Sequence, residues 1–201
     1  APRQLTNWPG TEEVPAWTYD GSALYFRADK DSKLADIWRV PATGGEPTRV
    51  TTAGNFGGPI ASIPGKAGFF AHTISSKAGQ VAISRFRVDG TSNVVWDKSS
   101  AFMNAPSSTG DSVLAAVEQP DGQFRSMILA ADGTGVRAIL PTGQSAMSLS
   151  KDGQWATCGL AAGGATDLGL LHVADGVTRR LTTTRESEEG DQRDPDRAAG
   201  H

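Results

Sequence analysis

The sequence has few of the residues from which covalent cross-links and metal clusters are built. It contains one cysteine, Cys158, so an internal disulfide and a thiolate metal cluster within the chain are excluded. Its three histidines, His72, His172 and His201, stand apart, with no pair at metal-ligand spacing. No metal site and no cofactor are therefore predicted.

Long hydrophobic runs and a basic excess are also missing. No apolar stretch approaches the roughly 20 residues that span a bilayer, and the first residues lack the apolar core of a signal peptide. The chain has 19 Lys and Arg against 22 Asp and Glu. Since a nucleic-acid surface normally shows as a basic stripe, no nucleic-acid partner is expected. The excess of acidic over basic residues lies in residues 185–201, which are expected to form a disordered tail.

The sequence is rich in turn-forming residues. It has 24 glycines and 11 prolines among apolar stretches of only a few residues. This composition predicts an all-β chain of many short strands joined by tight turns.

Two series of glycine-containing turns repeat along the chain with one period. In the first series the glycines are separated by 44, 45 and 43 residues, and in the second by 45, 43 and 43. The glycines of the first series are Gly21, Gly65, Gly110 and Gly153. Those of the second are Gly45, Gly90, Gly133 and Gly176. Because Asp-Gly suits a two-residue hairpin turn, positive φ is expected at both central positions.

Each repeat divides into four short segments. In the first repeat these are residues 15–18, 23–28, 36–40 and 48–51. Within 23–28, Leu24, Phe26 and Ala28 alternate with Ala23, Tyr25 and Arg27, as the two faces of a strand require.

A four-stranded unit of about 43 residues has the size of a β-propeller blade. An ordinary antiparallel sandwich is the alternative, because its strands and turns have a similar density. The sequence thus predicts a β-propeller with about four four-stranded blades over residues 1–184. The blades are expected at 7–52, 53–97, 98–140 and 141–184.

Residues 14–52 closely resemble the repeat of the TolB-like propellers, also called PD40 or WD40-like β-propeller repeats. The parts that carry the resemblance are Pro15-Ala16-Trp17, Asp20-Gly21, Asp36-Ile37-Trp38, Gly44-Gly45-Glu46-Pro47 and Arg49-Val50-Thr51. The fourth repeat keeps several of them, whereas the second and third keep chiefly the turn spacing and the strand alternation. The resemblance implies further blades and tilts the expected location towards the periplasm or the exterior of the cell.

The start of the chain resembles the end of the fourth repeat. Arg3-Gln4-Leu5-Thr6 matches Arg179-Arg180-Leu181-Thr182, so residues 3–6 are expected to form the outer strand of a preceding or shared blade. Since an open arc exposes an apolar blade face, we expect either a fragment of a longer propeller or a homo-oligomer that completes the ring.

No catalytic motif is found in the sequence. The string Gly143-Gln144-Ser145-Ala146-Met147 lacks the second glycine of a nucleophile elbow. Asp29, Asp31 and Asp36 could supply calcium ligands, but a structural turn is the favoured interpretation. The tryptophans are expected to pack between blades, with Trp8 as the exception.

The favoured function is a non-enzymatic scaffold that binds a protein or peptide partner at the channel mouth, as the resemblance implies. Arg27, His72 and Glu118 are the candidate partner-binding residues, chosen because they lie late in the second strands. The alternative is a substrate-gating propeller of a prolyl oligopeptidase-like serine peptidase or another hydrolase, with its catalytic domain outside this chain.

Overall fold

The computed structural model describes residues 3–30, 35–52, 54, 56–75, 77, 79–140, 145–162 and 165–183. These residues form sixteen β-strands in four antiparallel sheets, which confirms the all-β prediction. In the same ranges no helix has the length and apolarity to cross a membrane. The predicted tail, 185–201, lies outside the described residues.

Each sheet contains four strands that follow one another in chain order. Blade 1 consists of β1 (Glu12–Trp17), β2 (Ala23–Ala28), β3 (Asp36–Pro41) and β4 (Thr48–Arg49). Blade 2 consists of β5 (Phe56–Ser62), β6 (Phe69–Ile74), β7 (Val81–Phe86) and β8 (Ser92–Trp96). Blade 3 consists of β9 (Ala101–Pro106), β10 (Ser112–Glu118), β11 (Phe124–Ala130) and β12 (Val136–Ile139). Blade 4 consists of β13 (Ser145–Leu149), β14 (Trp155–Ala162), β15 (Ala165–His172) and β16 (Thr178–Arg180).

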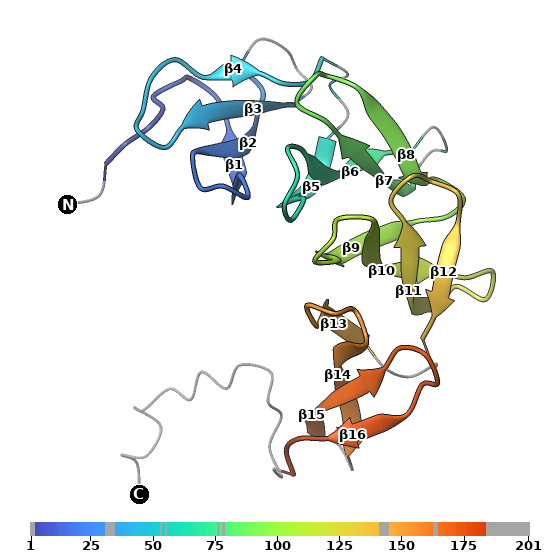
Figure 1. Ribbon diagram of the computed structural model, residues 1–201. Coiled ribbons are helices and arrows are strands. Elements are labelled where there is room, and N and C mark those ends of the chain that lie inside the picture. The colour runs from blue at the N-terminus through green and yellow to red at the C-terminus, as the bar shows by residue number, and fades with distance from the viewer. Residues whose placement is uncertain are drawn as a thin grey trace, which may run out of the picture.

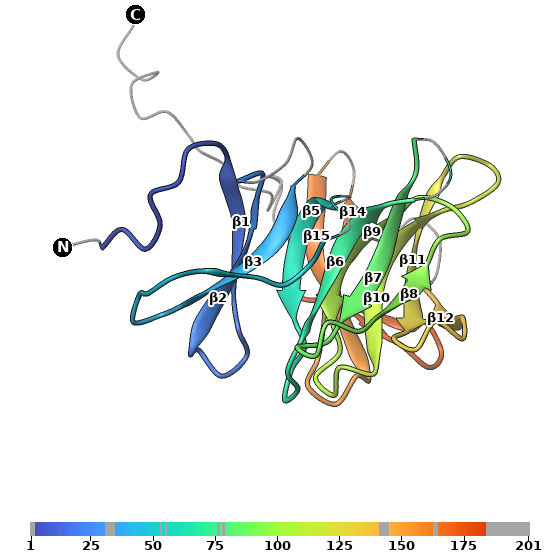
Figure 2. The same cartoon turned by 90° about the horizontal axis from the view of Figure 1, so that it is seen from above.

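The four blades form an arc whose concave side carries the first strand of each blade (Figure 1). Strands β1, β5, β9 and β13 contact one another in succession along this side. Seen from above, the strands run along the axis of the arc, and the chain turns back at its two ends (Figure 2). We call these ends the turn mouth and the loop mouth. The turn mouth carries the turns between first and second strands, at 18–22, 63–68, 107–111 and 150–154, and the loop mouth is the opposite end.

The repeated glycines occupy the turns with positive φ. All eight have φ between 64° and 128°, which glycine adopts freely. Of the residues that precede them only Gly44 has positive φ (85°), since Val14 is the only described non-glycine with positive φ. The prediction of two-residue turns is therefore wrong for the first series. In blade 1 the loop has four residues, with Gly21 N–H donating to Thr18 O (2.9 Å) and Thr18 N–H to Ala23 O (2.8 Å).

An aspartate stabilises the turn that precedes β2. The Asp20 carboxylate accepts hydrogen bonds from the Ser22 N–H (3.0 Å) and the Thr18 hydroxyl (2.6 Å). The same side-chain-to-backbone bond links Asp132 to Thr134 N–H and Asp152 to Gln154 N–H. Because Asp supplies this bond, a longer turn with one positive-φ glycine is preferred over the two-residue turn.

The blades are held together by apolar side chains from facing sheets. Tyr25 and Ile37 pack on Phe69 between blades 1 and 2, Phe70 contributes to the core between blades 2 and 3, and Leu114 to that between blades 3 and 4. The predicted alternation is confirmed in β2, because Leu24, Phe26 and Ala28 belong to a separate cluster on the other face of blade 1.

Residues 3–6 form no strand in the described structure, and their place as the outer strand of a preceding or shared blade stays a prediction. Leu5 and Trp8 instead pack on the free face of blade 1. The Trp8 ring lies 4.7 Å from Trp38, and the Lys30 ammonium lies 3.9 Å from the Trp8 centroid. The expectation that Trp8 escapes packing is therefore wrong; Trp17, at the end of β1, is the more exposed tryptophan.

Candidate functional site

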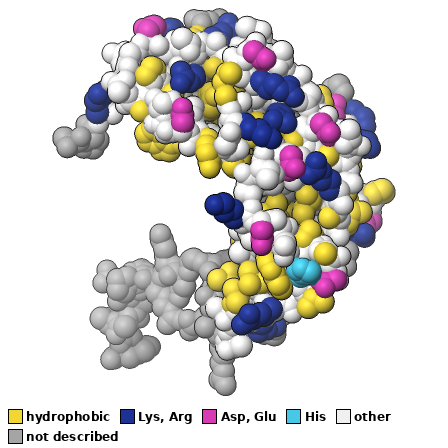
Figure 3. All heavy atoms as spheres, viewed as in Figure 1, with side chains coloured by type: hydrophobic (Ala, Val, Ile, Leu, Met, Phe, Trp, Pro, Cys, Tyr) yellow, Lys and Arg dark blue, Asp and Glu magenta, His cyan; other side chains and the backbone are white. Residues whose placement is uncertain are grey.

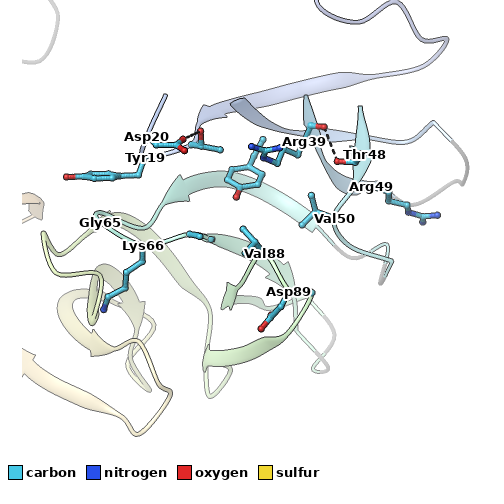
Figure 4. A pocket seen from close by; sticks show the side chains of 15 residues that line it. Tyr19, Asp20, Arg39, Thr48, Arg49, Val50, Gly65, Lys66, Val88 and Asp89 are labelled. Atoms are coloured by element: carbon cyan, nitrogen blue, oxygen red, sulfur yellow. Dashed lines mark hydrogen bonds between the residues drawn. The ribbon is translucent and has the colours of Figure 1, made fainter. Parts of the chain in front are cut away.

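A groove of about 880 Å³ opens between blades 1 and 2 at the turn mouth (Figure 4). One wall is blade 1, with the turn at 18–20 and parts of β2, β3 and β4. The other wall is blade 2, with residues 65–68 and 88–90. Figure 3 shows the turn mouth with Lys and Arg interspersed with Asp and Glu, so no single-sign charge patch covers this face.

Glycines line the blade 2 wall of the groove. Gly65 and Gly68 have no side chains, and a Cβ added to Gly68 would overlap the carbonyl oxygen of Phe86. At the next interface the packing is closer, since a Cβ added to Gly110 would overlap Ile63 Cγ2. Gly65 and Gly110 hold the same turn position in blades 2 and 3. Gly65 lines the open groove between blades 1 and 2, whereas Gly110 lies in close contact with blade 2.

The blade 1 wall carries a row of four side chains at directly paired strand positions. Ala16 pairs with Tyr25, Tyr25 with Arg39, and Arg39 with Thr48. Paired residues project from the same face of a sheet, and Tyr25 places this face against blade 2, because its ring lies 4.6 Å from that of Phe69. We call Ala16, Tyr25, Arg39 and Thr48 the blade 1 row.

Tyr25 forms the floor of the groove. Its side chain is only 2% exposed, and its hydroxyl has no hydrogen-bond partner among the described residues. Burial raises the pKa of Tyr25, so the hydroxyl stays protonated and able to donate.

The groove contains side chains of both charges. Arg39 makes one long contact, from its guanidinium to the Ser22 hydroxyl (3.5 Å), and Lys66 has no ion pair within the described part of the chain. Hydrogen bonds from Thr18 and Ser22 lower the pKa of Asp20 to about 2. Those from Thr91 lower the pKa of Asp89 in the same way. Both acids are thus fixed anions of their turns.

Arg49 belongs to a different arrangement. In Figure 4 it points away from the other labelled side chains. It forms an ion pair with Asp36, which is buried and also accepts hydrogen bonds from the Thr51 hydroxyl (2.8 Å) and Gly54 N–H (3.0 Å). These contacts tie the end of blade 1 to its third strand.

Two of the three aspartates considered as calcium ligands can be located. Asp36 is engaged by Arg49, Thr51 and Gly54, and Asp29 accepts a hydrogen bond from Thr11 N–H (2.9 Å). Asp31 lies outside the described residues. No group of three metal-ligand side chains occurs among those described.

The three sequence-predicted site residues lie in the second strands of three different blades. Arg27, paired with Glu13, lines a smaller pocket of about 200 Å³ near the loop mouth. Glu118 ends β10, with its backbone N–H donating to Ser100 O (2.9 Å). Arg27, His72 and Glu118 come from three separate sheets, so the structure does not bring them together in one pocket.

His72 is buried between blades 2 and 3. Its Nε2 accepts a hydrogen bond from the Met103 N–H (2.7 Å), and burial lowers its pKa. A Cβ on Gly58 would overlap the imidazole, so the glycine makes room for it. His72 therefore acts in the described structure as a contact between blades, and its role toward a partner stays a proposal.

The other singled-out residues are engaged within their own blade. His172 pairs with Asp175 (2.8 Å), and His201 lies outside the described residues. Cys158 is fully buried between blades 3 and 4, and burial raises the pKa of its thiol. Neither arrangement activates a nucleophile.

Sequence reasoning missed the groove because its two walls belong to different blades and its key row crosses four strands. Tyr25 and Arg39 are 14 positions apart and carry no motif. The one available signal was the pairing of the second and third segments, which would have placed both on one face.

No family model matches the sequence, and no curated protein matches it. Solved structures do. TolB from Acinetobacter baumannii has a TM-score of 0.66 at 15% identity, covering 87% of this chain and 44% of its own. A putative TolB from Agrobacterium tumefaciens has a TM-score of 0.65 at 19% identity, covering 90% and 65%. A putative dipeptidyl aminopeptidase IV from Bacteroides ovatus has a TM-score of 0.60 at 13% identity, covering 86% and 29%.

These likenesses, together with the four sheets, define the chain as a run of β-propeller blades. The fold is that of the TolB-like, or PD40, β-propellers, as the sequence predicted. The chain spans about two thirds or less of the length of each of these solved proteins.

Proposed function

We propose that the chain is the propeller of a non-enzymatic binding protein, and that it holds a protein or peptide partner at a channel mouth. The observation that carries this proposal is the groove between blades 1 and 2, which has the volume of a ligand site and a rigid wall on each side. Its floor is an aromatic ring whose hydroxyl has no partner among the described residues, Arg39 makes only one long contact, to Ser22, and Lys66 has no ion pair there.

The loop mouth is the second location. Arg27 and Glu118 would contact a partner there, and His72 would support the surface from below. The pocket beside Arg27 is less than a quarter of the volume of the turn-mouth groove, and its arginine is already paired with Glu13. We therefore favour the turn mouth.

Site-specific photo-crosslinking distinguishes the two mouths. A benzophenone amino acid would replace Val88 at the lip of the groove or Ile74 in the pocket near Arg27. The matched control is Val177, in the second-series turn of blade 4, which is 59% exposed against 62% for Val88. We expect partner crosslinks from position 88 and none from 177. Crosslinks from 74 alone would move the site to the loop mouth, and equal crosslinking from 88 and 177 would contradict a specific groove.

The alternative function is the substrate-gating propeller of a larger hydrolase. The likeness to the putative aminopeptidase favours it, because this chain matches only 29% of that protein. A reading frame that continues past His201 into an α/β-hydrolase pattern would support this alternative. Further copies of the 43-residue repeat would support the binding protein.

The outer face of blade 4 also exposes an apolar residue whose counterpart in blade 1 is buried. Ile37 in β3 is fully buried by blade 2, whereas its counterpart Leu168 in β15 is 37% exposed. Both residues are bonded alike, with their N–H groups donating to the hydroxyls of Thr51 and Thr182 (2.9 Å each). We propose that further blades of a longer chain cover Leu168, because the TolB structures extend beyond the matched part. A stable dimer in light scattering would instead favour the homo-oligomeric ring.

The TolB-like fold also supports a periplasmic or secreted location for the protein. Fractionation of cells that express the full reading frame would test this, and recovery with cytoplasmic markers would contradict it.

A further inference from the structure

Tyr25 is a core residue whose ring is buried, yet its hydroxyl is not one of the buried polar atoms without a partner, so this oxygen reaches the groove. The ring gains nothing in packing from a hydroxyl that phenylalanine would lack. The hydroxyl nevertheless lies at the floor of the groove, without a partner among the described residues.

Blade 2 shows that the position does not need a hydroxyl. Its corresponding row is Ala61, Phe70, Arg85 and Asn93, with the same strand pairing as the blade 1 row. Phe70 there is fully buried in the core between blades 2 and 3. The repeat therefore accepts phenylalanine beside arginine, and the tyrosine appears where a groove replaces the filled core.

Two positively charged hydrogen-bond donors, Arg39 and Lys66, also line the groove. Arg39 is the direct cross-strand neighbour of Tyr25, and its charge acts on the Tyr25 hydroxyl. Lys66 belongs to the opposite wall, where its side chain extends away from Arg39 (Figure 4), and it has no ion pair within the described residues. A phenolic O–H, a guanidinium and an ammonium are all donors, so together they suit an acceptor-only anion.

We infer that the groove is a carboxylate-binding site, in which Tyr25 and Arg39 bind one carboxylate of a peptide and the Lys66 ammonium adds positive charge on the other wall. Asp20 and Asp89 stay within their turns and keep the local charge near neutral, which suits a single carboxylate better than a polyanion such as a nucleic acid. The carboxylate comes from an acidic side chain or from a C-terminus. This inference rests on the proposed function, since it names the chemistry that the groove recognises.

NMR titration of the full chain tests the inference with two pairs of probes. The first pair is N-acetylglutamate N-methylamide and its glutamine analogue, and the second is N-acetylglycine and N-acetylglycinamide. We expect the two acids to shift the Arg39 Nε–H signal with saturation and the two amides to leave it unchanged. The Arg85 Nε–H signal is the internal control, because it holds the same row position in blade 2. A stronger response to one acid identifies the source of the carboxylate.

Two variants test the assigned groups. Y25F should bind the acids roughly tenfold more weakly, as expected for one lost hydrogen bond to a charged group, while its thermal unfolding is no lower than that of the parent. R39Q removes the Arg39 Nε–H reporter, so binding to this variant is followed by the backbone amide signals of the groove residues Tyr25 and Lys66, which should no longer respond to the acids. R179Q, on the exposed strand β16, should preserve the parental response. Equal responses to acids and amides, or parental affinity in both Y25F and R39Q, would overturn the inference.

The outcomes separate this inference from the proposed function. Partner crosslinking at position 88 without a response to the acids would overturn the carboxylate site alone. A response to the acids without crosslinking would overturn the protein-binding role alone.

Discussion

His72 connects blade 2 to blade 3 through one buried hydrogen bond, and its replacement by leucine probes that connection. Leucine fills much of the space but accepts no hydrogen bond, so the Met103 N–H would be left buried and unsatisfied. Such a group costs about 1–3 kcal/mol. We expect H72L to lower the free energy of unfolding by this amount at pH 7.5, measured by urea titration followed by tryptophan fluorescence.

The same residue should make stability depend on pH. Burial lowers the pKa of His72 in the folded chain, whereas the unfolded value is about 6.5. The unfolded chain therefore takes up the proton first, and stability falls as the pH drops below about 6.5, by at most about 1.4 kcal/mol per pH unit. The aspartates with lowered pKa values contribute stability above their unfolded values, which is lost only at more acidic pH.

The assay compares urea unfolding at several pH values from 7.5 to 5. The parent and the H172L control, whose histidine pairs with Asp175 in its own blade, should lose stability over this range. H72L should lose much less. A parental pH dependence in H72L would refute the assignment of this window to His72.

The remaining predictions concern glycine geometry, a buried ion pair and the thiol. G21A should cost about 1 kcal/mol, because φ is +69° but nothing lies near the new methyl group. G110A should cost about 2–4 kcal/mol in the same unfolding assay, because its methyl group also overlaps Ile63; equal costs would contradict the close contact. D36A should cost about 3–5 kcal/mol, since it leaves its arginine partner partly buried and unpaired; a change below 1 kcal/mol would contradict the structural role. Cys158 should react with a disulfide reagent only on unfolding, and rapid reaction of the native chain would contradict its burial.

The sequence predicted the parts of the fold that local chemistry determines. Glycine spacing located the turns because positive φ is cheap only for glycine, and alternation in residues 23–28 placed Phe26 and Tyr25 on opposite faces, as the structure confirms. The turn type was wrong because the Asp20 side chain binds the backbone two residues ahead. That bond favours a longer loop, and a dipeptide pattern does not reveal it.

The candidate site was harder to predict because it depends on the distance between blades. Lys66 and Tyr25 line one groove only because two sheets pack together, and neither residue's sequence neighbours indicate it. His72 was chosen for its place late in a strand, yet its environment is determined by Gly58 and Met103. Neither contact follows from a repeat period, since period fixes position within a blade and not the spacing between blades.

The repeats also show what a following blade contributes to the one before it. Asp36 and Asp167 occupy the same place in blades 1 and 4, and each is buried and paired with an arginine, Arg49 or Arg180. In blade 1 the second oxygen of Asp36 accepts bonds from Thr51 and from Gly54, on the path into blade 2. Among the described residues, which end at 183 in this blade, the corresponding oxygen of Asp167 is buried without a partner. Within the described structure the buried aspartate of the third strand is therefore more fully bonded in blade 1 than in blade 4.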